Sequence, residues 1–574
     1  MDLAPISDPT LVPSAIAQVL AVKESGGQPL LDSLKAYLRH KHVLLVLDNF
    51  EQVTSAAPLL AEMLMAAEHL KLLVTSRVTL HLTGEHEVAV PPLALPDPHH
   101  LPPLDRLRQY AAVDLFLQRC TAARAEFQVT TATAPAVAAI CVRLDGLPLA
   151  LELAAARIKL FPPDALLQRL DHRLTLLTGG ARDKEVRQQT LRNTIDWSYE
   201  LLTSAEQRLF QRLAVFAGGC TLEAAEAVCN ADGDLTIDVL DGLQSLIDQS
   251  LVRQEEGVEG EPRFTMLQTI QEYALEQLLA GDEAAATRRF HAEWFVRWAE
   301  SVAPRLHGPL EVSSVKRLNA DDMNLRAAHA WLLAQHEADM AARLGVALWF
   351  YYHLADRAAD GLRWLDEVLA AMDDRHAVQR ARVLPRAADL AWRTDDLVRA
   401  RAYAEAGVEL CTELGDTWGR ALGSLVLGHI ARSVADTAAA AVAYAESLAR
   451  FQEVGDAVWI ASGQLDLATV ALAQRDYTRA RSLLEQSQHR FRELGNSGGL
   501  ALALGLIGEA AHAQGDEAYA RRCLDESAAL LRARGETGGH AQAFVQAALE
   551  SWLHGNNERA TALLEQAVQQ HREA

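Results

Sequence analysis

The chain has 574 residues, half of them hydrophobic and 23% charged. This composition excludes a disordered protein and, at roughly 100–200 residues per domain, predicts roughly three to five globular domains. Asp and Glu outnumber Lys and Arg by 76 to 54, a net charge of −22, so attachment to nucleic acid over a broad surface is not expected. The six Cys form no C-x-x-C pair, the first residues do not resemble a signal peptide, and no apolar run is long enough for a membrane helix. We therefore expect a cytoplasmic protein without a zinc or disulfide framework.

Two short apolar runs near the start of the chain are each followed by a charged residue. The run 43–47 (VLLVL) predicts a strand buried on both faces of a parallel sheet, and Asp48 follows it. A carboxylate at this edge lies where open α/β sheets bind ligands, although many strands simply end in Asp. The run 72–74 leads to Arg77, which could contact a terminal phosphate or be an ordinary surface arginine. Residues 88–93 predict a further short strand stopped by proline.

The middle of the chain predicts helices and then a winged helix. Residues 144–149 read LDGLPL, and Pro148 stands where a helix can begin, since its missing N–H costs nothing there. Three helices and a late hairpin are predicted between residues 188 and 280. The third helix contains Asp238, Asp241 and Asp248 but no Lys or Arg. Since base and phosphate contacts need cations and amides, we expect direct DNA binding by this helix to be unlikely.

The second half of the chain repeats every forty residues. Three series keep this step: Gly415, Gly455, Gly495 and Gly535; Asp396, Asp436, Asp476, Asp516 and Asn556; Ala400, Ala440, Ala480, Ala520 and Ala560. An Asp or Asn can cap a helix, a small Ala lets two helices approach closely, and Gly can end a helix in the left-handed conformation. The series predict about six helix pairs from residue 337 on, with an unrelated helical bundle as the alternative. Such a solenoid offers a concave surface for a protein or peptide, and its surplus of acids favours a basic ligand.

Four segments occur in a recognisable order: LVLDNFEQ, LLVTSR, RLDGLPLALELAAAR and LRNTIDWSYELL. Together they resemble the STAND class of signalling ATPases and, more narrowly, the AP-ATPase or NB-ARC-like modules of bacterial transcriptional regulators. The repeats resemble tetratricopeptide repeats, so the resemblance covers essentially the whole chain. It implies a mainly α fold made of a truncated α/β P-loop-type domain (1–96), a helical domain with the GLPL motif (97–185), a winged-helix domain (186–285), a helical linker (286–336) and a tetratricopeptide-like α-solenoid (337–574).

The resemblance also implies a nucleotide site. The family's Walker B acid, which holds Mg²⁺ on bound ATP or ADP, corresponds to Asp48, and Glu51 is the nearest carboxylate that could orient water. The sensor arginine corresponds to Arg77, and the proline that packs near the adenine corresponds to Pro148. In the family a His after the wing touches the nucleotide, but Leu267 stands at the matching position here, so we do not expect that contact.

The phosphate-binding part of the nucleotide site does not occur in this sequence. A phosphate cradle needs G-x-x-x-x-G-K-[ST], and none of the seven Lys follows a Gly. The opening MDLAPISDPTLV resembles the family's second strand, so we expect the chain to begin about one βα unit late. The Walker B and sensor strands must then pair directly or leave backbone groups unsatisfied. We expect no bound cofactor and no ATP hydrolysis, because Asp48 alone cannot supply the charge stabilisation that phosphoryl transfer needs.

Two functions remain open from the sequence. The first is a STAND-type signal-transducing regulator, in which the repeats bind a protein or peptide partner and the switch module relays the signal. The second is a scaffold or adaptor that binds no nucleotide. Neither is an enzyme or a membrane protein, and both are compatible with a homo-oligomer.

Overall fold

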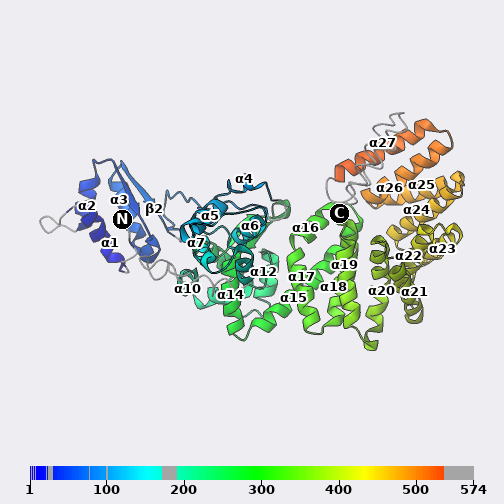
Figure 1. The fold of residues 1–574 in the computed structure, drawn as a ribbon, viewed down its shortest axis with the longest axis horizontal. Coiled ribbons are helices and arrows are strands. Elements are labelled where there is room, and N and C mark those ends of the chain that lie inside the picture. The colour runs from blue at the N-terminus through cyan, green and yellow to red at the C-terminus, as the bar shows by residue number, and fades with distance from the viewer. Residues whose placement is uncertain are drawn as a thin grey trace. The chain divides into compact units, whose positions relative to one another are not determined.

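The protein is described here by a computed structural model that covers residues 1–170, 191–534 and 561, except residues 2, 4, 5, 7, 21, 23–29, 77 and 98–100. Arg77 and the repeat positions Gly535, Asn556 and Ala560 therefore lie outside the described residues. The described chain is mostly helical, which confirms the mainly α fold class (Figure 1). It divides into two compact units, Met1–Glu256 with Pro262–Thr287, and Gly257–Glu261 with the residues from Arg288 on. None of the helices in the described ranges has the length and apolarity to cross a bilayer.

The first segment of the chain is a small α/β layer. Its elements are α1 (Val12–Val19), α2 (Leu30–Leu38), β1 (Val43–Leu47), η2 (Phe50–Ala56), α3 (Ala57–Ala66) and β2 (Leu70–Val74). Strands β1 and β2 pair in parallel, from Val43 opposite Leu70 to Leu47 opposite Val74. Of the two outcomes expected for these strands, direct pairing is the one observed.

The other edge of β1 is paired by the first residues of the chain. The N-terminal ammonium of Met1 donates to the carbonyl of Val46 at 2.8 Å, and the Leu3 N–H donates to the carbonyl of Asp48 at 2.9 Å. The Asp48 N–H in turn donates to the carbonyl of Met1 at 2.9 Å. The backbone groups at this end of β1 are thus satisfied from both sides.

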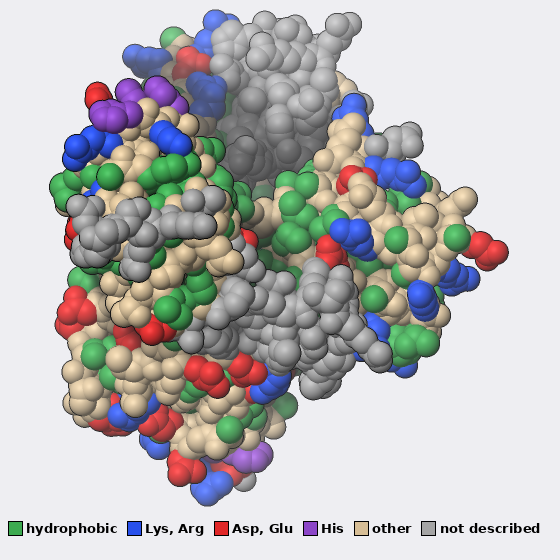
Figure 2. All heavy atoms as spheres, turned by 90° about the vertical axis from the view of Figure 1, so that its left-hand side faces the viewer, with side chains coloured by type: hydrophobic (Ala, Val, Ile, Leu, Met, Phe, Trp, Pro, Cys, Tyr) green, Lys and Arg blue, Asp and Glu red, His purple; other side chains and the backbone are tan. Residues whose placement is uncertain are grey.

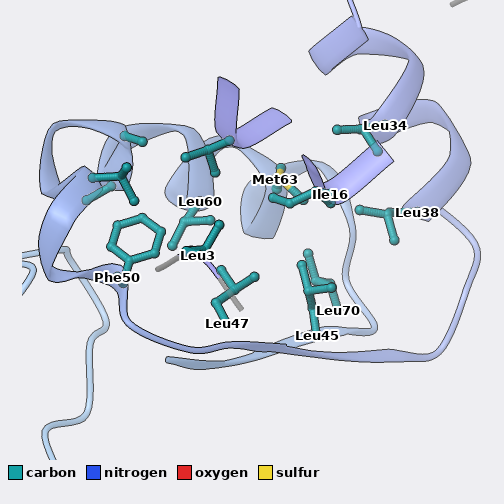
Figure 3. Close-up of a cluster of buried hydrophobic side chains, with 14 of the residues drawn as sticks. Leu3, Ile16, Leu34, Leu38, Leu45, Leu47, Phe50, Leu60, Met63 and Leu70 are labelled. Carbon is teal, nitrogen blue, oxygen red and sulfur yellow. The ribbon is translucent and has the colours of Figure 1, made fainter. Parts of the chain in front are cut away.

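Helices cover one face of this two-stranded sheet. Figure 3 shows the hydrophobic side chains that meet between the helices and the strands, namely Leu3, Ile16, Leu34, Leu38, Leu45, Leu47, Phe50, Leu60, Met63 and Leu70. On the opposite face Leu44, Val46 and Leu73 are 62%, 41% and 56% exposed. The prediction that the first strand is buried on both faces is therefore wrong in the described structure, because α1, α2 and α3 pack on a single face. Figure 2, viewed from the side on which this segment lies in Figure 1, shows hydrophobic side chains on the surface.

A helical segment follows. The prediction of a strand at residues 88–93 is wrong. These residues have no strand pairing in the described chain, and Val88 and Val90 are 82% and 89% exposed. Pro91 and Pro92 have no N–H to donate to a neighbouring strand. The helices are α4 (Leu104–Leu107), α5 (Ala111–Ala123), α6 (Ala134–Arg143), α7 (Pro148–Ala156) and α8 (Pro163–Arg169). Pro148 is the first residue of α7, as its missing N–H predicts.

The next segment has the helices and hairpin expected of a winged helix. Its elements are α10 (Leu191–Glu200), α11 (Ser204–Leu213), β3 (Cys220–Thr221), α12 (Leu222–Cys229), α13 (Val239–Asp248), β4 (Arg253–Glu256), β5 (Pro262–Thr265) and α14 (Gln268–Ala280). The three strands form an antiparallel sheet in the order β3-β5-β4. Thr203 caps α11 in a capping box with Glu206, which fixes where this helix begins.

The remaining described chain is a row of helices, shown from green to orange in Figure 1. It begins with α15 (Ala284–Val302), η7 (Ala303–His307), α16 (Glu311–Ala320) and α17 (Asp322–Ala334). Five helix pairs follow, namely α18 (Ala338–Leu354) and α19 (Ala358–Ala371), α20 (Ala377–Arg393) and α21 (Leu397–Leu414), α22 (Thr417–Ser433) and α23 (Thr437–Val454), α24 (Ala457–Ala473) and α25 (Tyr477–Glu493), and α26 (Ser497–Ala513) and α27 (Glu517–Arg534). The repeats predicted between residues 337 and 534 are confirmed.

The repeating residues have the roles that the sequence predicts. The side chains of Asp396, Asp436 and Asp476 each accept a hydrogen bond from a backbone N–H three residues on, which caps the second helix of each pair. Gly415 and Gly455 end helices with φ of 72° and 79°, in the left-handed region that glycine adopts at low cost. Ala400, Ala440, Ala480 and Ala520 are fully buried between helices.

Candidate functional site

Asp48 lies at the carboxyl end of β1, next to the end of β2. Its carboxylate accepts a hydrogen bond from the Thr75 hydroxyl, and that hydroxyl accepts one from the Asn49 N–H at 3.1 Å. Asp48 is exposed, whereas Glu51, in the first turn of η2, is only 8% exposed. The parallel pairing thus brings Asp48 to the edge where the sequence placed it.

The donor set around Asp48 is one part of what holds Mg²⁺ and a nucleotide in P-loop enzymes. In P-loop enzymes the metal and phosphates are held by backbone N–H groups, a Lys and a Ser or Thr of the phosphate cradle together with the acid, and the sequence has no such cradle. In the part of the chain that the structure describes, no group of three or more His, Cys, Asp or Glu side chains could hold a metal ion.

The turn before Pro148 joins two segments of the first unit. The Asp145 carboxylate accepts hydrogen bonds from the N–H of Thr269 at 3.1 Å and from its hydroxyl at 3.3 Å, which satisfies a free N–H at the start of α14. Gly146, with φ of 64°, leaves room for the carbonyl oxygen of Leu93, which would lie 2.4 Å from an added Cβ. Pro148 itself is exposed. In the structure, this motif therefore links the helical segment to the winged-helix segment.

The winged-helix segment is tied to the start of α15 by a buried arginine. Arg212 on α11 donates to the Cys229 carbonyl at 2.6 Å, to both oxygens of Asp234 at 2.7 and 2.8 Å, and to Glu283 at 2.8 Å. Arg208 pairs with the same two carboxylates. These hydrogen bonds lower the pKa of Asp234 and of Glu283. Sequence reasoning missed this cluster, whose partners are separated by up to 75 residues.

Helix α13, which contains the acidic residues noted in the sequence, presents few groups that suit DNA. Its exposed side chains include Leu240, Asp241 and Gln244, and Gln244 donates to Asp248 at 2.8 Å. The Asp238 carboxylate caps this helix by accepting hydrogen bonds from two backbone N–H groups. The acidic character that the sequence indicated therefore lies on the surface.

A short segment between the linker helices crosses the repeat unit. The His307 ring lies 4.0 Å from the Phe350 ring on α18 and 6.0 Å from the Trp459 ring on α24. The His307 carbonyl accepts from the Asn496 amide at 3.2 Å, a contact between residues 189 apart. The segment thus connects the first helix pair with the fourth and the fifth, and no local sequence signal predicted it.

Comparisons with known proteins agree with the winged-helix part of this description. Residues 202–279 match the family model of a winged helix-turn-helix domain. The protein named "Putative HTH-type transcriptional regulator Rv0890c" of Mycobacterium tuberculosis is 36% identical over 429 residues, which are 72% of this chain and 46% of that protein. The chain thus spans about half the length of this curated relative. "Uncharacterized protein Rv0894" of the same species is 35% identical over 287 residues, 50% of this chain and 70% of that protein.

Among solved structures, a STAND protein with a tetratricopeptide repeat sensor, PH0952 from Pyrococcus horikoshii, aligns with 98% of this chain and 87% of its own, at 13% identity and a TM-score of 0.32.

The winged helix-turn-helix match bears on one expectation from the sequence. It does not support the exclusion of DNA binding that the charge of residues 238–248 suggested. The acidic surface of α13 alone does not decide the question, since wing and flanking residues also contact DNA in such domains.

Proposed function

We propose that this chain, which belongs to the same family as "Uncharacterized protein Rv0894" of Mycobacterium tuberculosis, is a signal-transducing regulatory protein of transcription with the organisation of the STAND class. In this proposal the helical repeats bind a protein or peptide partner, and the segments before them relay the binding. The name of the longer relative Rv0890c, "Putative HTH-type transcriptional regulator", supports the transcriptional part.

One observation carries the proposal. Residues 202–279 match a winged helix-turn-helix domain, and five helix pairs, from α18 to α27, follow later in the same chain. A domain of a kind that binds DNA and a row of helix pairs of a kind that binds proteins or peptides are the two parts that a partner-responsive regulator of transcription requires.

For this chain we propose no step of the STAND-class mechanism that requires ATP hydrolysis. Asp48, Arg77 and Pro148 correspond to nucleotide-binding positions only through the resemblance to the STAND class, and without a phosphate cradle we propose that this chain does not hydrolyse ATP. The test is ATP turnover by the full chain with Mg²⁺, compared with an Asp48→Ala variant. Equal background rates are expected, and turnover by the parent above that of Asp48→Ala would contradict the proposal.

A scaffold that binds no nucleotide is the second candidate, favoured by the hydrogen bond that occupies Asp48. Calorimetry with ADP and Mg²⁺ separates the two candidates, because only a switch predicts saturable heat that Asp48→Ala removes. Selection from a random-sequence duplex library tests the transcriptional part. Enrichment of a common sequence motif by the parent chain supports a regulator that reads DNA itself. If neither saturable heat nor motif enrichment is observed, the regulator is wrong and the scaffold remains as the function.

A further inference from the structure

A cavity of about 310 Å³ lies within the repeat unit. Its walls come from the first helices of three successive pairs, α18, α20 and α22, and from α15 and η7. This volume falls at the lower end of the range, roughly 300–1,000 Å³, of sites that bind small molecules. Nothing in the sequence pattern distinguished this position from the rest of the repeats.

The cavity contains an arginine whose charge is not matched by a carboxylate. Arg386 on α20 donates from Nη1 to the Arg382 carbonyl at 2.6 Å, and its buried Nε has no hydrogen-bond partner among the described residues. Within those residues it makes no ion pair; the acid that acts on it from a greater distance, Asp416, caps α22 by accepting from the Gly419 N–H. A half-buried guanidinium with an unused donor is a site at which an anion gains a charge-assisted hydrogen bond.

The other charged groups of the cavity do not supply that anion. Glu300 is engaged by Arg343, which donates to both of its oxygens at 2.8 and 2.7 Å. Arg382 is exposed and adds a second positive charge. Burial lowers the pKa of Arg386 to about 10, so the guanidinium is charged at neutral pH but poorly solvated, and an anion beside it would offset that cost. The cavity is therefore locally cationic although the chain carries a net charge of −22.

Aromatic rings surround the guanidinium. Arg386 lies 4.4 Å from the ring centre of Trp418 and 5.5 Å from that of Trp349. Both indole N–H groups are occupied, by Asp456 at 3.0 Å and by Asp389 at 2.9 Å, which fixes the two rings. The rings therefore offer a ligand carbon surface and not a hydrogen-bond donor, and such surfaces pack well against a flat apolar group.

We propose that this cavity binds a small planar carboxylate, with its carboxylate on Arg386 and its ring against Trp349 and Trp418. A carboxylate suits the site better than a phosphate, because a dianion would need more than the one unpaired buried guanidinium that the cavity offers. The proposal goes beyond the regulatory function and does not depend on it, since the site is complete within the repeat unit.

The experiment is calorimetry of the full chain with 2-naphthoate and with the neutral amide of the same shape, 2-naphthamide. If the carboxylate pairs with the guanidinium, naphthoate should bind at least about tenfold more tightly than the amide, as expected for one charge-assisted hydrogen bond. Arg386→Met should remove this preference, and Arg386→Lys, which keeps the charge but not the fork, should leave part of it. Arg380→Met is the matched control, since Arg380 is on the same helix but does not line the cavity.

Thermal unfolding followed by circular dichroism shows that each variant is folded before it is titrated. Equal binding of the acid and the amide by the parent chain would overturn the proposal. So would a preference for the acid that survives Arg386→Met, or the absence of naphthoate binding. A regulator that reads DNA or binds ADP could still lack this site, so the two proposals fail independently.

Discussion

Replacing Arg212 with methionine should be the most destabilising single change among the polar contacts of the winged-helix segment. The Arg212 side chain is 8% exposed and makes four hydrogen bonds, to the Cys229 carbonyl, twice to Asp234 and once to Glu283. Methionine keeps much of the length of the side chain but none of its donors. The change therefore removes the buried cation without opening a large cavity.

The expected cost follows from what remains after the substitution. Breaking a buried ion pair by removing one partner costs about 3–5 kcal/mol, since it leaves the other charge uncompensated. Here Arg208 also donates to Asp234 and Glu283, so both carboxylates keep one cation. We therefore expect the lower end, about 3 kcal/mol. Arg208→Met is the matched control; its side chain is 36% exposed, and the expected cost is about 1 kcal/mol.

Hydrogen exchange measured by mass spectrometry on the full chain reads this local stability. If locally opened helices close again faster than their amides exchange, a loss of about 3 kcal/mol in local stability raises the exchange rate of protected amides in α11 and α13 roughly 100-fold. The corresponding increase for Arg208→Met is roughly fivefold. Exchange in α22–α25 should not change and serves as the internal reference. Similar effects of the two substitutions, or unchanged protection in α13, would refute the argument that Arg212 is the centre of the cluster.

Three further predictions follow from single contacts. Gly146→Ala should destabilise the first unit by about 3 kcal/mol, because φ is 64° and the new Cβ would lie 2.4 Å from a backbone carbonyl oxygen; a thermal shift no larger than that of a surface Gly→Ala change would contradict this. Ser487→Ala should cost about 1 kcal/mol, since the buried Ser487 hydroxyl donates to a carbonyl of the preceding helix at 2.8 Å, whereas exposed Ser482→Ala on the same helix should be neutral in urea unfolding. The pKa of Glu283 and of Asp234 is lower in the folded chain, so their contribution to stability is present above about pH 4 and is lost as pH falls; a urea midpoint of the winged-helix segment that does not fall between pH 6 and pH 3 would argue against it.

The repeats could be predicted from the sequence because each depends on local contacts. A cap such as Asp436 bonds within its own helix, and Gly455 adopts a conformation set by its own backbone. Both signals recur every forty residues, so each repeat confirms the next. The direct parallel pairing of β1 and β2 was one of the two outcomes that the sequence left open.

Contacts between residues far apart could not be predicted in this way. Asp145 holds Thr269 across 124 residues, and His307 meets Asn496 across 189. Neither pair has a spacing that a helix or strand imposes, and each residue alone is compatible with an ordinary turn or cap. The exposure of Leu44 was missed for a related reason, because a continuous apolar run shows that a strand can be buried on both faces but not that a second layer is present.

The charge of the repeats shows most clearly what composition leaves out. Surplus acid over residues 337–574 predicts a basic partner for the surface as a whole, and that prediction stands untested. Yet α20 places Arg382 and Arg386 one turn apart, where both line the same cavity, while the acid in its lining, Glu300, is already bound by Arg343. A ligand responds to the few groups within several ångström of it, because charges beyond about a Debye length are screened. A solenoid with an acidic surface can therefore hold a cationic cavity, and the sign of its ligand is decided by helix faces and not by the sum over the chain.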